Sequence, residues 1–160
     1  YLYTGGYPYS EGIFEDINKY IMLSYYSGET LISHDAVRRY AKFEFCCDDT
    51  ALVDAIERSE TGLTRGTDYK SWRFPISDTS DVEYVYETLS AYDRKLPENI
   101  RTTKKWRMMY LRAVIDHELI GCDFDPTRSD RCVEAMNELR ALYHTNHETL
   151  RCVCPPTVKL

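Results

Sequence analysis

The sequence lacks both a long apolar run and an excess of positive charge. None of its 160 residues belong to a run that approaches the roughly 18 apolar residues needed to cross a bilayer, and its start does not resemble a signal peptide. The formal net charge is -6, with lysines and arginines scattered among acidic residues, so no basic face is available for phosphate backbones or anionic lipid. We therefore expect a soluble protein that binds neither nucleic acid nor membrane.

Cysteine is too sparse for a disulfide scaffold. The six cysteines comprise the adjacent pair Cys46-Cys47, the separate Cys122 and Cys132, and a C-x-C pair at 152–154. Neither close pair has the C-x-x-C spacing of a structural zinc site, and we predict no metal and no cofactor. Reduced thiols packed as small apolar groups are the favoured interpretation, with a Cys122–Cys132 bridge as the alternative. The low cysteine density slightly favours a cytoplasmic location.

Apolar residues are plentiful and follow helical spacing. Hydrophobic residues make up 43% of the chain and aromatic residues 13%, which is enough for a compact domain or part of a larger one. The expected N-terminal caps are Ser33, Asp48 or Asp49, Ser80 with Glu83 in a capping box, and Thr103. Apolar residues recur every three or four positions in six segments, and this predicts helices over about 13–27, 33–45, 48–61, 80–96, 103–120 and 130–143.

The fold class predicted from this pattern is mainly α, with about six helices and one short N-terminal strand. Residues 1–4 (YLYT) favour β structure, but a single strand cannot form a sheet alone. Because the chain also starts without methionine, we expect a truncated beginning. Residues 63–77 lack periodicity and are predicted to form a long connection.

Residues 5–12 (GGYPYSEG) contain three glycines and a proline, which predicts a tight turn, and they include one acidic residue. Glycine adopts backbone shapes that other residues resist and proline fixes φ, so this turn should hold Glu11 in a defined direction. Glu15 and Asp16 follow in the first turn of the next helix, where acidic side chains commonly stabilise the positive end of the helix dipole. That electrostatic role is the structural alternative to chemistry for Glu11 and Asp16.

Two blocks of this sequence resemble certain bacterial glycoside-hydrolase-like proteins, distantly similar to the α-glucuronidases and α-N-acetylglucosaminidases. Residues 6–19 (GYPYSEGIFEDINK) resemble the closing segment of the catalytic barrel in that family. Residues 105–119 (KWRMMYLRAVIDHEL) and the ending Pro155-Pro156 resemble the helical region that follows the barrel. The likeness extends over nearly the whole chain. The vicinal Cys46-Cys47 and the C-x-C pair depart from the family pattern.

The resemblance implies a (β/α)₈ barrel whose last strand, loop and helix are residues 1–27 and whose C-terminal helical domain is residues 28–160. Active sites of this fold lie in the loops after the strands, so Glu11 would be a catalytic carboxyl group, with Tyr7, Tyr9 and Asp16 contacting the sugar. Tyrosine rings can stack on the apolar face of a sugar, although core packing explains the two tyrosines equally well. Glycosidic cleavage usually needs two carboxyl groups, and the second would lie upstream with the rest of the barrel.

Other polar motifs favour structural roles. His117 lies in Asp116-His117-Glu118, which lacks the H-E-x-x-H spacing of a zinc site, and we interpret it as a histidine at a helix interface. A histidine pair three residues apart, at 144 and 147, is expected to be solvent-exposed. Arg107 and Arg112 are expected to pair with Asp116 or Glu118 across helical turns. The alternative is that they reach the barrel loop and orient the Glu11 side chain.

The sequence therefore supports two hypotheses. In the first, the chain is the C-terminal part of a carbohydrate-active, glycoside-hydrolase-like protein; it contributes one active-site loop and supporting helices and is inactive alone. Its partners would be a carbohydrate substrate and the upstream remainder of the barrel. In the second, it is a free-standing helical binding or scaffold module without catalysis, in which the GGYPYSEG turn is purely structural.

Overall fold

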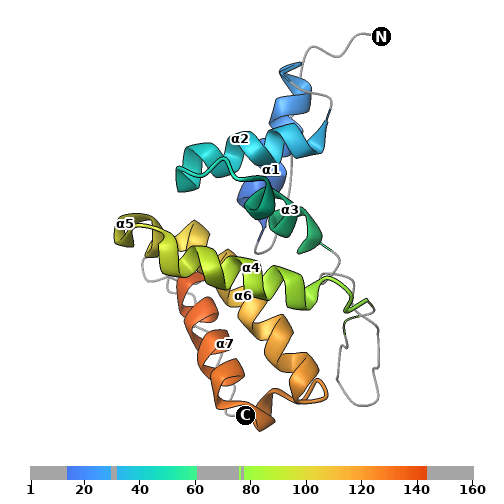
Figure 1. Ribbon diagram of the computed structural model, residues 1–160, viewed down its shortest axis with the longest axis vertical. Coiled ribbons are helices and arrows are strands. Elements are labelled where there is room, and N and C mark those ends of the chain that lie inside the picture. The colour runs from blue at the N-terminus through green and yellow to red at the C-terminus, as the bar shows by residue number, and fades with distance from the viewer. Residues whose placement is uncertain (1–13, 30–31, 61–75, 77, 144–160) are drawn as a thin grey trace, which may run out of the picture. The chain divides into compact units, whose positions relative to one another are not determined.

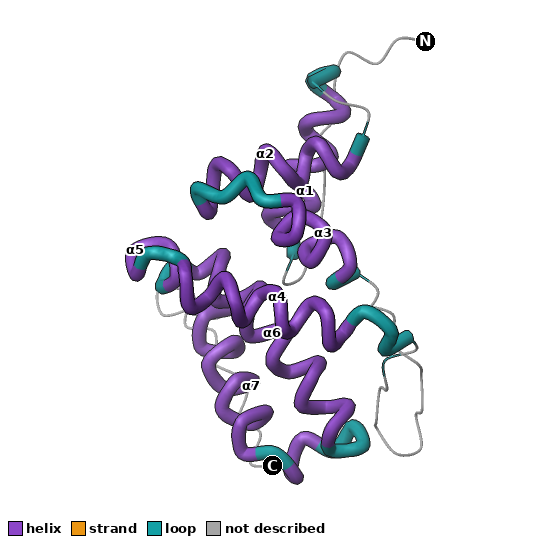
Figure 2. Tube along the Cα trace, viewed as in Figure 1, coloured by secondary structure: helices purple, strands orange, loops and turns teal. Residues whose placement is uncertain are grey.

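A computed structural model describes residues 14–29, 32–60, 76 and 78–143. Within these residues the secondary structure is helical and contains no β-strand (Figures 1 and 2). The prediction of a mainly α fold is confirmed for this part of the chain. The predicted strand at 1–4 and most of the connection at 63–77 lie outside the described residues.

The chain divides into two compact helical units, residues 1–57 and residues 58–160. We call them the first and the second helical unit. The sequence analysis expected a different boundary, at residue 27, between the end of a barrel and a helical domain. That boundary remains a prediction.

The described part of the first unit contains three helices: α1 (Glu15–Tyr26), α2 (Ser33–Phe45) and α3 (Thr50–Arg58). α1 packs against α2. In α2 and α3 the helical spacing of apolar residues matches the buried positions, because each helix turns one stripe of side chains toward the interior. In α1 only Ile17 and Ser24 are buried. The buried side chains of the first unit include Ile17, Ala36, Val37, Tyr40, Ala41, Phe45, Leu52, Val53, Ala55 and Ile56.

The ends of these helices follow local backbone chemistry. α1 ends just before Ser27, and Gly28 has a φ of +73°, a left-handed conformation that glycine adopts without steric cost. Asp49 is confirmed as a capping residue of α3, since its carboxylate accepts a hydrogen bond from the Ala51 N–H at 3.0 Å. The predicted cap at Ser33 is wrong: α2 begins at Ser33, Ile32 occupies the cap position, and no side chain caps the helix there.

The second unit is built around one long helix, α6 (Lys104–Gly121). α6 packs against α4 (Val82–Lys95) and against α7 (Asp130–Tyr143), and these three helices are coloured from green to orange in Figure 1. A short helix, α5 (Glu98–Arg101), precedes α6, and a 3₁₀ turn, η2 (Pro126–Arg128), precedes α7. α5 was not predicted, because four residues are too few to show a periodic pattern.

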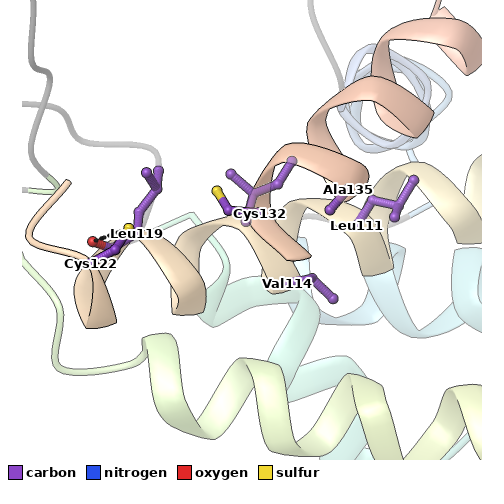
Figure 3. Packing of buried hydrophobic residues seen from close by; sticks show 7 residues of the cluster. Leu111, Val114, Leu119, Cys122, Cys132 and Ala135 are labelled. Carbon is purple, nitrogen blue, oxygen red and sulfur yellow. Dashed lines mark hydrogen bonds between the residues drawn. The ribbon is translucent and has the colours of Figure 1, made fainter. Parts of the chain in front are cut away.

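α6 is buried on more than one side because it lies between two partner helices. Its buried residues include Trp106, which is 0% exposed, together with Leu111 and Ile115. Toward α7, side chains such as Leu111 and Val114 share one apolar cluster with Cys132 and Ala135 (Figure 3).

α7 turns one face toward the core of the second unit, and Ala141 and Tyr143 are exposed. Cys132 and Ala135 are buried, and Met136, Leu139 and Leu142 pack against the same cluster. This set follows steps of three and four residues, whereas steps of two, from Leu139 to Ala141 to Tyr143, leave the buried face of a helix.

Of the two caps predicted in the second unit, one is confirmed. The Thr103 hydroxyl accepts a hydrogen bond from the Trp106 N–H at 3.3 Å at the start of α6. The capping box of Ser80 and Glu83 is wrong, because Asp81 is the residue before α4 and no side chain caps that helix. The Ser80 N–H instead donates to the Asp78 carboxylate at 2.9 Å.

A polar network joins the three long helices of the second unit. The Trp106 indole N–H donates to Oδ1 of Asp93 at 2.8 Å, which satisfies the one polar atom of a fully buried ring. The neighbouring Arg107 donates through Nε and Nη2 to the two oxygens of Glu138 at 2.7 and 2.8 Å. α6 therefore binds α4 through Trp106 and α7 through Arg107.

No described helix is both long enough and apolar enough to cross a membrane.

The Trp106–Asp93 contact makes a stability prediction. We expect Trp106→Phe to lower the free energy of unfolding by roughly 2–3 kcal/mol, because it opens a void in the core and removes the donor to Asp93. Urea denaturation followed by far-ultraviolet circular dichroism measures the change. Tyr84→Phe, an exposed aromatic residue of α4, is the matched control and should change stability by less than about 0.5 kcal/mol; an equal effect of both substitutions contradicts the prediction.

Candidate functional site

Of the four predicted site residues, Asp16 is the one that falls within the described chain. Tyr7, Tyr9 and Glu11 lie outside the described residues. Asp16 is in the first turn of α1 and is exposed, and its Oδ2 accepts a hydrogen bond from the Tyr40 hydroxyl at 2.8 Å. The first turn of α1 is thus bound to α2.

The partner of Asp16 belongs to the core of the first unit. Tyr40 is 4% exposed, and its ring makes edge-on contacts with Tyr20 and Phe45 at centroid distances of 5.6 and 5.8 Å. Burial, followed by the hydrogen bond to Asp16, raises the pKa of Tyr40 far above its ordinary value. The hydroxyl therefore keeps its proton and acts as a fixed donor, which holds the Asp16 carboxylate in place.

A second cluster in the first unit brings together three groups that commonly bind metals. His34 lies in the first turn of α2, and Asp54 and Glu57 lie on α3. One ligand atom from each residue falls within 4.8 Å of the others. Nδ1 of His34 is 2.8 Å from Oε2 of Glu57. All three residues are partly exposed, so the cluster is open to solvent.

Negative charge around His34 favours its protonated form. The hydrogen bond to Glu57 raises the pKa of His34 above 6.5, against a smaller opposing effect of burial, with further support from the charges of Glu57, Asp54 and Asp35. Sequence reasoning missed this cluster. The available signal was the spacing of Asp54 and Glu57, three apart on one helix face, together with a histidine at the start of the preceding helix.

The third polar cluster surrounds His117 in the second unit. The imidazole stacks on the ring of Tyr86 from α4 at a centroid distance of 3.9 Å. Its Nε2 is 3.2 Å from Oε2 of Glu83. Nδ1 is buried and has no hydrogen-bond partner. The interpretation of His117 as a histidine at a helix interface agrees with these contacts between α6 and α4.

The residue after His117 joins α6 to the start of α7. Oε2 of Glu118 accepts a hydrogen bond from the Ser129 hydroxyl at 2.8 Å, and Oε1 accepts one from Nη1 of Arg131 at 3.1 Å. The Arg131 guanidinium lies 5.3 Å from the centroid of the Tyr86 ring. A hydrogen bond with Tyr86 raises the pKa of Arg131 above its ordinary value. These contacts order the turn between α6 and α7 and serve packing.

Of the two arginines Arg107 and Arg112, one pairs as predicted and the other does not. Nε of Arg112 donates to Oδ2 of Asp116 at 2.8 Å, one helical turn away, which is the local pairing that was predicted. Arg107 does not follow that prediction, since its guanidinium lies 3.8 Å from Asp93 of α4 and 2.7 Å from Glu138 of α7. Both arginines therefore brace the second unit.

The four described cysteines are free thiols in different surroundings. Cys122 and Cys132 are buried, Cys46 is exposed and Cys47 is partly exposed. The favoured interpretation of reduced thiols packed as apolar groups is confirmed for Cys122 and Cys132, and the alternative bridge between them is absent. Burial raises the pKa of Cys132 to about 11, so its reactive thiolate is scarce at neutral pH.

Comparison with known proteins gives no relative: no family model, curated protein or solved structure matches this chain.

The His34–Glu57 contact predicts a titration. We expect the pKa of His34 to exceed 6.5 in the folded chain and to fall toward that value in Glu57→Gln, because the substitution removes the charged acceptor. Since the folded pKa is the higher one, the contact stabilises the first unit fully below pH about 6.5 and loses its contribution as the pH rises through the folded pKa. NMR titration of the imidazole measures the shift. Glu134→Gln on α7 is the control, and a His34 titration unaffected by Glu57→Gln refutes the interaction.

The cysteine environments predict an order of reactivity. Iodoacetamide at neutral pH should modify Cys46 and Cys47 in the native protein, and should reach Cys122 and Cys132 only after unfolding in urea, because both are buried. Peptide mapping by mass spectrometry resolves each site, although the adjacent pair requires fragmentation. Modification of native Cys132 at the rate of Cys46 is the result that rules out the buried thiol.

Proposed function

We propose that this chain is the C-terminal part of a carbohydrate-active, glycoside-hydrolase-like protein, to which it contributes one active-site loop and a supporting layer of helices. The basis is the resemblance of residues 6–19 and 105–119 to that family. The proposal includes the finer description of the fold, in which residues 1–27 are the last strand, loop and helix of a (β/α)₈ barrel. In it, Glu11 is a catalytic carboxyl group, while Tyr7, Tyr9 and Asp16 contact the sugar.

The observation that carries the proposal is the hydrogen bond between Tyr40 and Asp16. A catalytic loop needs a rigid support, because a displacement of about 1 Å can lower a rate substantially. The loop proposed here runs directly into α1, and the first turn of α1 is held by a buried phenol of α2 at 2.8 Å. Asp16 is also exposed, as a sugar-contacting carboxylate must be.

Under this proposal the remaining polar clusters support the fold. The contacts of Arg107, Arg112 and Glu118 run between helices or along one helix. A layer of this kind covers a barrel without supplying reacting groups. The second carboxyl group required for glycosidic cleavage would come from the upstream part of the barrel.

A second candidate function is a helical binding or scaffold module. The observation in its favour is that each helical unit has its own set of buried side chains, as a free-standing module requires. The genomic reading frame separates the two candidates. Alternating strand and helix patterns upstream of Tyr1 favour the barrel, whereas a start codon or signal peptide directly before Tyr1 favours the module.

The catalytic role of Glu11 predicts a loss of turnover. In the full-length protein, Glu11→Gln should lower kcat on aryl α-glucuronides or α-N-acetylglucosaminides by about 100-fold or more, because an amide can replace a carboxyl group neither as acid or base nor as nucleophile. Glu15→Gln, the same change four residues later where the side chain pairs with Lys19, is the matched control and should retain turnover. Circular dichroism verifies that both variants are folded. Full turnover of Glu11→Gln removes this residue from the mechanism.

A further inference from the structure

The cluster of His34, Asp54 and Glu57 in the first unit has the donor set and the spacing of a metal site. His34 projects from the start of α2, and the two acids project from α3. Asp54 and Glu57 are three residues apart, so their side chains lie on the same face of the helix. Two helices that are separate in sequence thus direct one imidazole and two carboxylates toward a common point.

The distances between ligand atoms suit a bound ion after small side-chain rotations. Two ligands bound to Zn²⁺ at about 2.0–2.2 Å lie about 3–3.5 Å apart in tetrahedral or octahedral geometry. Nδ1 of His34 and Oε2 of Glu57 are 2.8 Å apart, and no pair of the three ligand atoms is separated by more than 4.8 Å. The Asp54 side chain is partly exposed, so it has room to rotate toward a bound ion.

The chemistry of the three donors limits the choice of ion. Ca²⁺ and Mg²⁺ prefer sites made of oxygen alone, and Cu⁺ prefers sulfur. One imidazole nitrogen with two carboxylates suits Zn²⁺ and, more weakly, Mn²⁺ or Fe²⁺. Two carboxylates also neutralise the charge of a divalent cation. Because the cluster is open to solvent, water can complete the coordination.

We propose that His34, Asp54 and Glu57 bind a divalent transition-metal ion, for which Zn²⁺ is the best match, and that the ion links α2 to α3. The cluster is distinct from the GGYPYSEG loop, and the proposal does not depend on the proposed function. Binding to the folded state alone raises its stability. The role that follows is structural, since the ion would join the start of α2 to α3.

Asp54 is the position that separates a metal site from a simple pair of His34 and Glu57. Asp54→Asn leaves the hydrogen-bonded pair in place and keeps the size of the side chain, but it replaces a charged ligand with a weak one. Asp35→Asn is the matched control: it removes the same charge from the residue next to His34, and Asp35 is exposed and outside the ligand set.

The experiment adds Zn²⁺ to the full chain and follows the His34 imidazole by NMR, with the signal assigned by its loss in His34→Gln. Following one imidazole excludes binding at other histidines or cysteines from the readout. We expect saturable shifts of the His34 signals in the wild type and in Asp35→Asn, and an affinity lower by about 10-fold or more in Asp54→Asn. Zn²⁺ should also raise the melting temperature of the wild type more than that of Asp54→Asn.

Two results overturn the proposal. One is the absence of any His34 shift with Zn²⁺ in the wild type. The other is an equal affinity in Asp54→Asn and Asp35→Asn, which identifies adventitious binding to a histidine on an acidic surface. If Asp54→Asn loses helical circular dichroism, Asp54→Glu provides the test: it keeps the charge but lengthens the side chain, and it should alter the affinity at His34 while Asp35→Glu does not.

Discussion

The constraint on which the first helical unit depends is the burial of Tyr40. A phenol placed among Tyr20 and Phe45 contributes apolar contact area, but its hydroxyl needs an acceptor, because an unpaired buried hydroxyl costs about 1–3 kcal/mol. Asp16 supplies that acceptor from the first turn of α1. Burial of Tyr40 therefore fixes the orientation of α1, since α1 cannot rotate about its axis without breaking this hydrogen bond.

The second unit meets the same requirement with Trp106 in place of Tyr40. Its ring is fully buried, and its one polar atom reaches Asp93 of α4. Arg107, the next residue, points toward α7 and binds Glu138. Successive residues of a helix differ in direction by about 100°, so Trp106 binds α4 while Arg107 reaches α7, although its guanidinium also lies 3.8 Å from Asp93. The long central helix is consequently fixed on two sides by two consecutive side chains.

The sequence allowed prediction of those features that one helix determines by itself. Helical periodicity located α1, α2, α3, α4, α6 and α7, and Thr103 was identified as a cap because it is the last residue before a clear periodic segment. The prediction of Ser80 as a cap was wrong because residues 78–81 (DTSD) are all capable of capping a helix, and the local sequence does not show which of them does so. Asp78 binds the Ser80 N–H, and α4 begins one residue later than the box requires.

Features that depend on two helices could not be predicted from one stretch of sequence. The pairing of Asp16 with Tyr40 joins residues 24 positions apart, and that of His34 with Glu57 joins residues 23 positions apart. Each depends on the packing of one helix against another, which periodicity does not specify. For the same reason Arg107 was assigned to acids on its own helix, whereas its bidentate partner Glu138 is on α7.

The two proposals for the first unit involve different partners of α2. Tyr40, in the middle of α2, donates to Asp16 at the start of α1, while His34, at the start of α2, lies close to Asp54 and Glu57 of α3. Removing a metal ligand on α3 leaves the buried phenol and its contact with Asp16 intact. Loss of the proposed ion should therefore loosen α3 while the contact of α2 with α1 persists, because the hydrophobic contacts of Tyr40 do not depend on the charges around His34. The site on α3 and the proposed catalytic loop are thus separable, although one helix supports both.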